Sequence, residues 1–463
     1  MVKTLQTISP IDGSVYVERA LATEADIESA LERAEAARLA WKRTPLAERI
    51  AICRAAIEVF AGAQADIANE LTWMMGRPIR YAPGEVRGFV ERATYMADIA
   101  ESALADIRIA DKPGFTRFIR REPLGIAFVI APWNYPYLTA VNAVVPAILA
   151  GNVVLLKHSA QTPLCAERMV DAFRVAGLPD GVFQYLHLSH EDTGRVIKAR
   201  EIKHVAFTGS VAGGAMVERA AAGRFITSGL ELGGKDPAYV RADADLGHAV
   251  ETAIDGAFFN SGQSCCGIER IYVHASVHDE FVERAVALVG QYRLGRSDDP
   301  ETTLGPLVRS EAAAFVRAQI AEALVQGANA HIDPEAFPCN ALGTPYLAPQ
   351  VLTKVDHSMR VMTEESFGPV VGIQKVSDDE EAVRLMNDSD YGLTAAIFSR
   401  DVEAATVLGE RIDTGTVFLN RCDYLDPALA WTGVKHSGRG CTLSSVGFEH
   451  LTRPKSFHLK TQA

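Results

Sequence analysis

Short apolar strands alternate with helices from Asn152 onward, and this alternation limits the possible folds more than any other feature. The runs NVVLLKHS, VFQYLHL and KHVAFTGS look like strands, and each is followed by a helical pattern. Strands joined by crossover helices build a parallel sheet with helices on its faces. The alternation therefore predicts an α/β fold. A dinucleotide-binding domain often has this architecture, although a fold alone does not establish chemistry.

Two further regions flank this one, and the 463 residues suffice for two or three domains. Helical periodicity dominates the first hundred residues, where Thr23 and Asp26 form a predicted capping box and Pro45 begins another helix. A second α/β pattern follows, without repeats or flexible linkers. Its predicted helices lie near 243–261, 276–292, 309–327 and 378–388.

Charge and cysteine usage exclude several classes of function. A net charge of -12 argues against a nucleic-acid or anionic-membrane partner. The seven cysteines form neither an even framework nor a Cys-x-x-Cys pair, so we predict no metal site and a reducing, cytoplasmic compartment. The opening residues MVKTLQTISPIDGSV lack the apolar core of a signal peptide.

The strongly apolar segment 125–156 imitates a membrane span. Three prolines and three asparagines interrupt it, and such helix breakers and polar groups are costly in lipid. We therefore expect buried core here, and no membrane partner.

Cys265 and Cys266 follow a Gly-Gln-Ser turn and precede a strand-like run. Small neighbours and facing backbone amides favour a thiolate that attacks carbonyl carbon, although paired cysteines are also common core fillers. Glu231 stands 34 residues earlier, between two leucines (265 minus 231). A buried carboxylate there needs hydrogen bonds or a proton, so Glu231 is either a general base or a solvated residue at a strand end.

Two more stretches carry ambiguous signals. Asn134, held between aromatics and prolines in APWNYPY, is either a hydrogen-bond donor to an oxyanion or a turn residue. FTGSVAGG follows a strand and opens a helix but fails the Gly-x-Gly-x-x-Gly fingerprint. A helix N-terminus with small residues can still receive a pyrophosphate.

Seven short motifs together resemble the aldehyde dehydrogenase superfamily, in order and over nearly the whole chain. They are PWNYP, LLKHSAQTPL, FTGS, ELGGKDP, GQSC, EESFGPV and GTVFLN. The resemblance implies that Cys265 is the nucleophile and that Glu231 activates water. It also implies an oxyanion hole formed by Asn134 and the Cys265 backbone N–H, with no direct role for Cys266.

The resemblance further implies an NAD or NADP cofactor. Lys157 would bind the adenosine ribose, Gly209 and Ser210 would lie near the pyrophosphate, and Glu365 would hold the nicotinamide ribose. Outside the resemblance, Glu365 would be an exposed acid. The predicted cofactor residues are Pro132, Trp133, Lys157, Ser159, Ala160, Gly209, Ser210, Leu232, Glu365 and Phe367.

The implied reaction oxidises an aldehyde to its carboxylic acid through a thiohemiacetal and a thioester on Cys265, which water then hydrolyses. A CoA-acylating dehydrogenase is an alternative. Such enzymes commonly lack the general-base glutamate, so the presence of Glu231 argues against it. A catalytically silent scaffold is another, opposed by the presence of Cys265, Glu231 and Asn134. The nucleotide-site residues argue against a third alternative, a thioesterase or esterase without redox chemistry.

Two positions depart from the family pattern. Ala160 stands three residues after Lys157, where NAD-preferring relatives often carry a glutamate that accepts from the ribose 2′-hydroxyl. Without that glutamate, no carboxylate repels the 2′-phosphate of NADP, so we predict that NADP is accepted and can be preferred over NAD. Trp431 stands where a Pro-Phe-Gly-Gly stretch is common, so a relative's substrate does not transfer. Tyr135, Phe259 and Trp431 are predicted to line the entry for a small or medium aldehyde.

The resemblance also implies an architecture: a Rossmann-like NAD(P)-binding domain, an α/β catalytic domain and a small β oligomerisation element. Alternating side chains in FTRFIRR and KSFHLK suit strand addition between subunits, so we expect a homodimer or homotetramer. The ranges are 1–104 and 124–233 for the first domain, 234–436 for the second, and 105–123 and 437–463 for the element.

Overall fold

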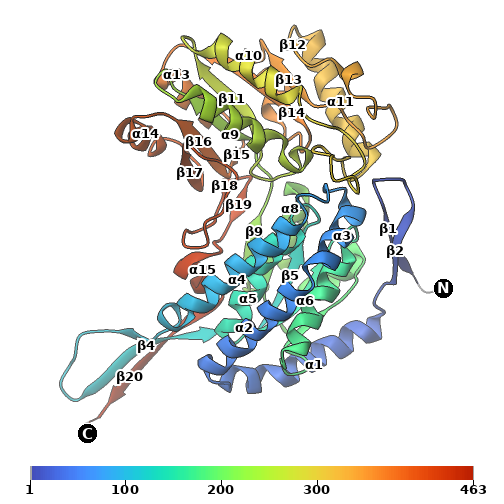
Figure 1. Cartoon of the computed structure of the whole chain (residues 1–463). Coiled ribbons are helices and arrows are strands. Elements are labelled where there is room, and N and C mark those ends of the chain that lie inside the picture. The colour runs from blue at the N-terminus through green and yellow to red at the C-terminus, as the bar shows by residue number, and fades with distance from the viewer. Residues whose placement is uncertain (1–2, 462–463) are drawn as a thin grey trace.

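The structure is a computed structural model that describes residues 3–461 (Figure 1). The first two and last two residues lie outside the described part, so the predicted ranges 1–104 and 437–463 are covered except for those ends. Two sheets flanked by helices form the body, and a narrow β ribbon extends from it. The predicted α/β class is confirmed.

A six-stranded sheet in the order β19-β9-β8-β5-β6-β7 contains the alternating region. Its first five strands in sequence run parallel, and β19 pairs antiparallel with β9. Carboxyl ends of parallel strands share one edge, so Asn134, Gly209 and Glu231 are brought to that edge. The strands are β5 (Ile126–Ala131), β6 (Val153–His158), β7 (Phe183–Tyr185), β8 (Ile202–Thr208), β9 (Thr227–Glu231) and β19 (Gly438–Arg439).

Helices cover this sheet. The apolar segment 125–156 contributes two of its strands, β5 and β6, and the helix α5 that connects them. Every residue of β5 and β6 is buried, as predicted for core. No helix in residues 3–461 is long and apolar enough to cross a membrane. The helices between these strands are α5 (Pro136–Ala150), α6 (Pro163–Val175), α7 (His190–Lys198) and α8 (Val211–Ala221).

The predicted helical region forms α1 (Glu24–Arg43), α2 (Leu46–Gly62), α3 (Gln64–Met75) and α4 (Pro83–Ala103). Thr23 and Asp26 make the predicted capping box, and Pro45 is the N-cap of α2. The hairpin of β1 (Thr4–Ile8) and β2 (Val15–Ala20) was not predicted.

A seven-stranded sheet in the order β12-β13-β14-β11-β10-β16-β17 holds the second α/β region. All four helices predicted there are present, as α9 (Leu246–Phe258), α10 (His278–Val289), α11 (Ser310–Val325) and α13 (Asp379–Asn387), followed by α14 (Val402–Gly409). The strands are β10 (Asp236–Val240), β11 (Ile268–His274), β12 (Asn329–Ala330), β13 (Gln350–Thr353), β14 (Val370–Val376), β16 (Thr394–Phe398) and β17 (Thr416–Leu419).

The ribbon at the lower left of Figure 1 consists of β4 (Phe115–Pro123) and β20 (Thr452–Lys460), paired antiparallel over their length. The short β3 (Ile107–Arg108) pairs with the other edge of β4. Phe118 and Phe457 stack across the pair with ring centroids 4.5 Å apart. The strands expected from the alternation in FTRFIRR and KSFHLK are therefore present, and helix α15 (Ser444–His450) leads into the second of them.

Gly438 lets the C-terminal segment return to the six-stranded sheet. It lies opposite Glu231 in the β19–β9 pair and has φ +111°. A Cβ at this position would lie 1.9 Å from the Leu230 carbonyl oxygen. Only glycine allows both the backbone conformation and this close approach.

We predict that Gly438→Ala lowers the free energy of unfolding by about 3 kcal/mol, because backbone strain and a backbone clash add. Urea titration measures the change. Gly343→Ala is the matched control, since Gly343 has φ +77° but no atom within 4 Å of the added Cβ. It should lower the stability by only about 1 kcal/mol. Equal effects of the two substitutions would contradict the role of the close approach.

Candidate active site

Cys265 lies where two cavities meet. It follows the short helix η1 (Phe259–Gly262) and precedes β11. A cavity of about 370 Å³ is lined by Cys265, Glu231 and all three predicted substrate residues, Tyr135, Phe259 and Trp431. A second cavity, of about 200 Å³, is lined by Cys265, Asn134 and a different set of predicted residues. The thiol thus reaches both spaces.

The second cavity brings together most of the predicted cofactor residues: Pro132, Trp133, Gly209, Ser210, Leu232, Glu365 and Phe367. Lys157, Ser159 and Ala160 do not line it. Lys157 lies near the end of β6, where it pairs with Ile130 of β5, and Ser159 and Ala160 follow that strand. The Ala160 carbonyl accepts a hydrogen bond from Thr7 Oγ1 at 2.9 Å. Sequence reasoning missed three lining residues, Thr208, Gly233 and Arg309.

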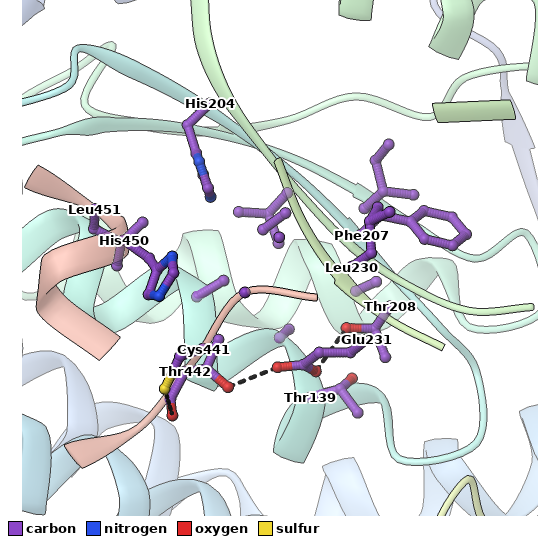
Figure 2. A pocket seen from close by; sticks show the side chains of 18 of the residues that line it. Thr139, His204, Phe207, Thr208, Leu230, Glu231, Cys441, Thr442, His450 and Leu451 are labelled. Carbon is purple, nitrogen blue, oxygen red and sulfur yellow. Dashed lines mark hydrogen bonds between the residues drawn. The ribbon is translucent and has the colours of Figure 1, made fainter. Parts of the chain in front are cut away.

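Glu231 is held by two hydroxyl groups, as Figure 2 shows. Thr208 Oγ1 donates to one carboxylate oxygen at 3.0 Å and Thr442 Oγ1 donates to the other at 2.6 Å. Burial raises the pKa of the Glu231 carboxyl, and the two hydrogen bonds oppose this rise. The carboxylate is therefore fixed in orientation and shifted toward the pKa range of a general base.

Glu231 also lines a small cavity of about 30 Å³, together with His204, Cys441 and His450 (Figure 2). Thr442 comes from the C-terminal segment, 211 residues from Glu231 in sequence. No local motif marks Thr442, so only the return of the chain along β19 shows its contact with Glu231.

Asn134 lies against the loop that carries Cys265. Its side-chain nitrogen donates to the Gln263 carbonyl at 3.3 Å. Asn260 and Ser261 have φ of 53° and 58°, which turns the loop sharply before the thiol. Gln263 ties the loop down, because its side-chain oxygen accepts from the Val308 amide at 2.8 Å. The amide NH₂ of Asn134 has two N–H groups, so one can donate to a ligand beside Cys265.

A buried ion pair between Arg77 and Glu85 organises this region. Glu85 accepts from the backbone amides of Tyr137 and Leu138, at 2.9 and 3.0 Å, in the first turn of α5. Its negative charge thereby meets the positive end of the helix dipole. Arg77 donates to the Asn134 carbonyl at 2.6 Å and to Asn260 Oδ1 at 3.2 Å. The pair connects Asn134 with the thiol loop, and neither residue was predicted.

Glu365 belongs to the second cavity and sits against the Gly-Gly turn after Glu231. Its carboxylate accepts from the Gly234 amide at 2.8 Å. A Cβ on Gly233 would lie 2.5 Å from a Glu365 carboxylate oxygen, so a larger residue there would displace the Glu365 carboxylate. Burial raises the pKa of Glu365 to about 7, and nearby Glu269 adds to the rise.

The neighbouring thiol, Cys266, has partners of its own. Its Sγ donates to Asp423 Oδ1 at 3.1 Å, and Ser264 Oγ donates to the same oxygen at 3.4 Å. A hydrogen bond with Cys265, together with burial, raises the pKa of the Cys266 thiol. Cys266 lines only the larger of the two cavities that meet at Cys265. The structure therefore separates the two adjacent thiols by environment.

The larger cavity can accept a small organic molecule, and the smaller one contains a carboxylate and the start of α8. Ser210 caps α8, accepting a hydrogen bond from the Gly213 amide, so the helix presents its N-terminus to the second cavity.

Within residues 3–461, no group of three or more His, Cys, Asp and Glu side chains is arranged to hold a metal ion. Fold and site together define an oxidoreductase that works beside a dinucleotide.

Comparisons with known proteins agree with this class. The model for the aldehyde dehydrogenase family matches residues 1–457. A succinate-semialdehyde dehydrogenase [NADP(+)] from Deinococcus radiodurans is 36% identical over 97% of this chain and 93% of its own length. The chain therefore belongs to the aldehyde dehydrogenase family, and its activity is the NAD(P)-dependent oxidation of an aldehyde.

Solved structures show the same similarity. A succinic semialdehyde dehydrogenase from Streptococcus pyogenes in complex with NADP+ superposes with a TM-score of 0.94 at 30% identity, over 98% of this chain and 100% of that one. A betaine aldehyde dehydrogenase from Staphylococcus aureus in complex with NAD+ has a TM-score of 0.93 at 28% identity, over 100% and 92% of the two chains.

We predict that Glu85→Gln lowers the free energy of unfolding by about 3 to 5 kcal/mol, because it leaves the buried Arg77 without a charged partner. Urea titration followed by circular dichroism measures the loss. Glu35→Gln is the control, since Glu35 and Arg38 form an exposed pair and its loss should change stability by about 0.5 kcal/mol. A Glu85→Gln effect as small as the control's would show that the buried pair has no organising role.

Proposed function

We propose that Cys265 is the nucleophile, Glu231 the general base and Asn134 the oxyanion donor in the oxidation of an aldehyde to its carboxylic acid. The observation that supports this most is the position of Cys265, which lines both the larger cavity and the cavity with Glu365. A thiol in that position can hold a substrate carbon next to a bound nicotinamide. Glu231, in the wall of the larger cavity, can serve a water on the substrate side.

The proposed reaction has two stages. The Cys265 thiolate adds to the aldehyde carbon, and the carbonyl oxygen becomes an oxyanion that accepts a hydrogen bond from the Asn134 amide. A thioester on Cys265 remains after oxidation. Glu231 then takes a proton from water, whose oxygen adds to the thioester carbon. The carbon–sulfur bond breaks, and the acid and the free thiol result.

The residues of the second cavity fit a dinucleotide. The bound nicotinamide ring would accept the hydride that leaves the substrate carbon. We propose that Glu365 accepts from hydroxyls of the adjoining ribose, and that the N-terminus of α8, with Gly209 and Ser210, receives the pyrophosphate. We also propose that Lys157 and Ser159 bind the adenosine ribose. Ala160 adds no carboxylate there, which supports use of NADP as well as NAD, as do the NADP-dependent relatives.

We also propose the wider organisation that the motifs imply. The NAD(P)-binding domain would comprise 1–104 and 124–233, the catalytic domain 234–436, and the oligomerisation element 105–123 and 437–463. The exposed β4–β20 ribbon supports assembly into a homodimer or homotetramer. The cysteines are all free, which supports a cytoplasmic location.

We predict that Cys265→Ala lowers kcat by at least about a thousandfold, because no thiohemiacetal can form. Glu231→Gln should release about one equivalent of NAD(P)H per site in a burst, and then turn over at least about a hundredfold more slowly. Stopped-flow absorbance of the reduced cofactor measures both. Full activity of the Cys265 variant would refute the mechanism. A large acceleration by added CoA, with an acyl-CoA product, would favour the acylating alternative.

We predict that Thr442→Val moves the acid limb of the hydrolysis rate to higher pH, since the lost hydrogen bond no longer lowers the pKa of Glu231. The rate falls as pH falls through this pKa, because only the carboxylate acts as base. A pH series of steady-state rates measures the shift. Thr208→Val should shift the limb in the same direction, whereas the control Thr406→Val, on α14, should not. An unchanged profile for both active-site variants would contradict the assigned base.

A further inference from the structure

Arg92 is a buried arginine in the wall of the larger cavity. It lies on α4 and is 7% exposed. One guanidinium nitrogen, Nη1, donates to the Leu138 carbonyl at 2.5 Å and to Asn142 Oδ1 at 3.3 Å, both on α5. These acceptors are neutral. No carboxylate within residues 3–461 lies at ion-pair distance from Arg92, although the guanidinium borders a cavity.

A buried cation without a charged partner is unfavourable, and burial lowers the pKa of Arg92 accordingly. Glu85, Glu231 and Glu91 oppose this shift only from a distance. Glu85 is already paired with Arg77, and Glu91 accepts from the Tyr424 hydroxyl at 2.5 Å. The nearby carboxylates are thus engaged elsewhere, and the charge of Arg92 is left without a contact partner.

The remaining charged groups of the cavity point to the same conclusion. Asp423 accepts hydrogen bonds from Cys266 and Ser264, and burial raises its pKa to about 7, so its negative charge is partly neutralised. Arg87, one turn and a residue before Arg92 on α4, adds a second cation at the exposed rim. Each acid of the cavity accepts a hydrogen bond, whereas Arg92 and Arg87 have no carboxylate at ion-pair distance within residues 3–461.

We propose that Arg92 selects aldehydes whose far end carries a carboxylate or another oxyanion, which would supply the missing partner of the guanidinium. The relatives named above do not indicate the charge of this enzyme's substrate, because succinate semialdehyde is anionic whereas betaine aldehyde is cationic. The uncompensated Arg92 favours the anion and disfavours the cation. This inference rests on the proposed function, with the aldehyde carbon at Cys265 and its tail in the larger cavity.

The first test compares three linear aldehydes of similar length, ending in a carboxylate, a methyl ester or a trimethylammonium group. We expect kcat/KM of the wild-type enzyme to be at least about tenfold higher for the carboxylate than for the ester, and lowest for the cation. Equal values for carboxylate and ester, or a preference for the cation, would overturn the inference. If none of the aldehydes yields NAD(P)H, the proposed function fails instead.

The second test uses Arg92→Met and Arg92→Lys. Arg92→Met should reduce the carboxylate-to-ester ratio to about one, mainly through a higher KM for the carboxylate, and Arg92→Lys should retain part of the ratio. Arg174→Met, an exposed arginine on α6, makes the same charge change and should keep the wild-type ratio. If Arg92→Met lowers kcat/KM for both aldehydes equally, or only shifts the pH profile, Arg92 has a structural role or supports Glu231, and the inference is wrong.

Asn142→Asp keeps the guanidinium and covers the case in which Arg92→Met does not fold. The new carboxylate would pair with Arg92, so the preference for the anionic aldehyde should again be lost. Calorimetric titration of the Cys265→Ala holoprotein with a short dicarboxylate provides a readout without turnover. We expect binding that weakens at least about tenfold on adding Asn142→Asp. Absence of binding, or binding unchanged by the second substitution, would overturn the inference whether or not the proposed function holds.

Discussion

The position of the site depends on the buried ion pair between Arg77 and Glu85. A pair in a low-dielectric interior is favourable only when its remaining hydrogen-bonding groups are satisfied. Here, the amides that open α5 satisfy Glu85, and the Asn134 carbonyl and Asn260 satisfy Arg77. The chain after β5 and the loop before Cys265 therefore share one anchor, although they lead into different sheets.

Low dielectric is also the common property of the acids around Cys265. Burial raises the pKa values of Glu231, Glu365 and Asp423, each in a different wall. Each is oriented by specific donors: hydroxyls for Glu231, an amide for Glu365, and a thiol and a hydroxyl for Asp423. In such surroundings a single uncompensated charge has a large effect, which explains why Arg92 can decide between substrates of opposite charge.

Adjacent positions in the sequence need not share a role. Cys265 and Cys266 are neighbours, but only Cys265 lines both of the cavities that meet beside it, while Cys266 donates to Asp423. The two glycines after Glu231 differ in the same way: a Cβ on Gly233 would strike Glu365, and one on Gly234 would lie 2.2 Å from the Cys265 carbonyl oxygen. Close packing between loops from distant parts of the chain gives each residue its own constraint.

Local pattern by itself determined the α/β class, the helices of the first hundred residues and those after residue 233, and the residues in the short motifs, because periodicity and turn chemistry act over a few residues. It missed the β1–β2 hairpin, which carries only a weak alternation. Tertiary structure alone decided the roles of Glu85, Arg92 and Thr442. The partners of Glu85 on α5 lie 52 and 53 residues away in the sequence. Asn142 lies 50 residues from Arg92, and Glu231 lies 211 residues from Thr442. Such contacts depend on how the chain returns to the sheet edge, and no local sequence signal encodes that return.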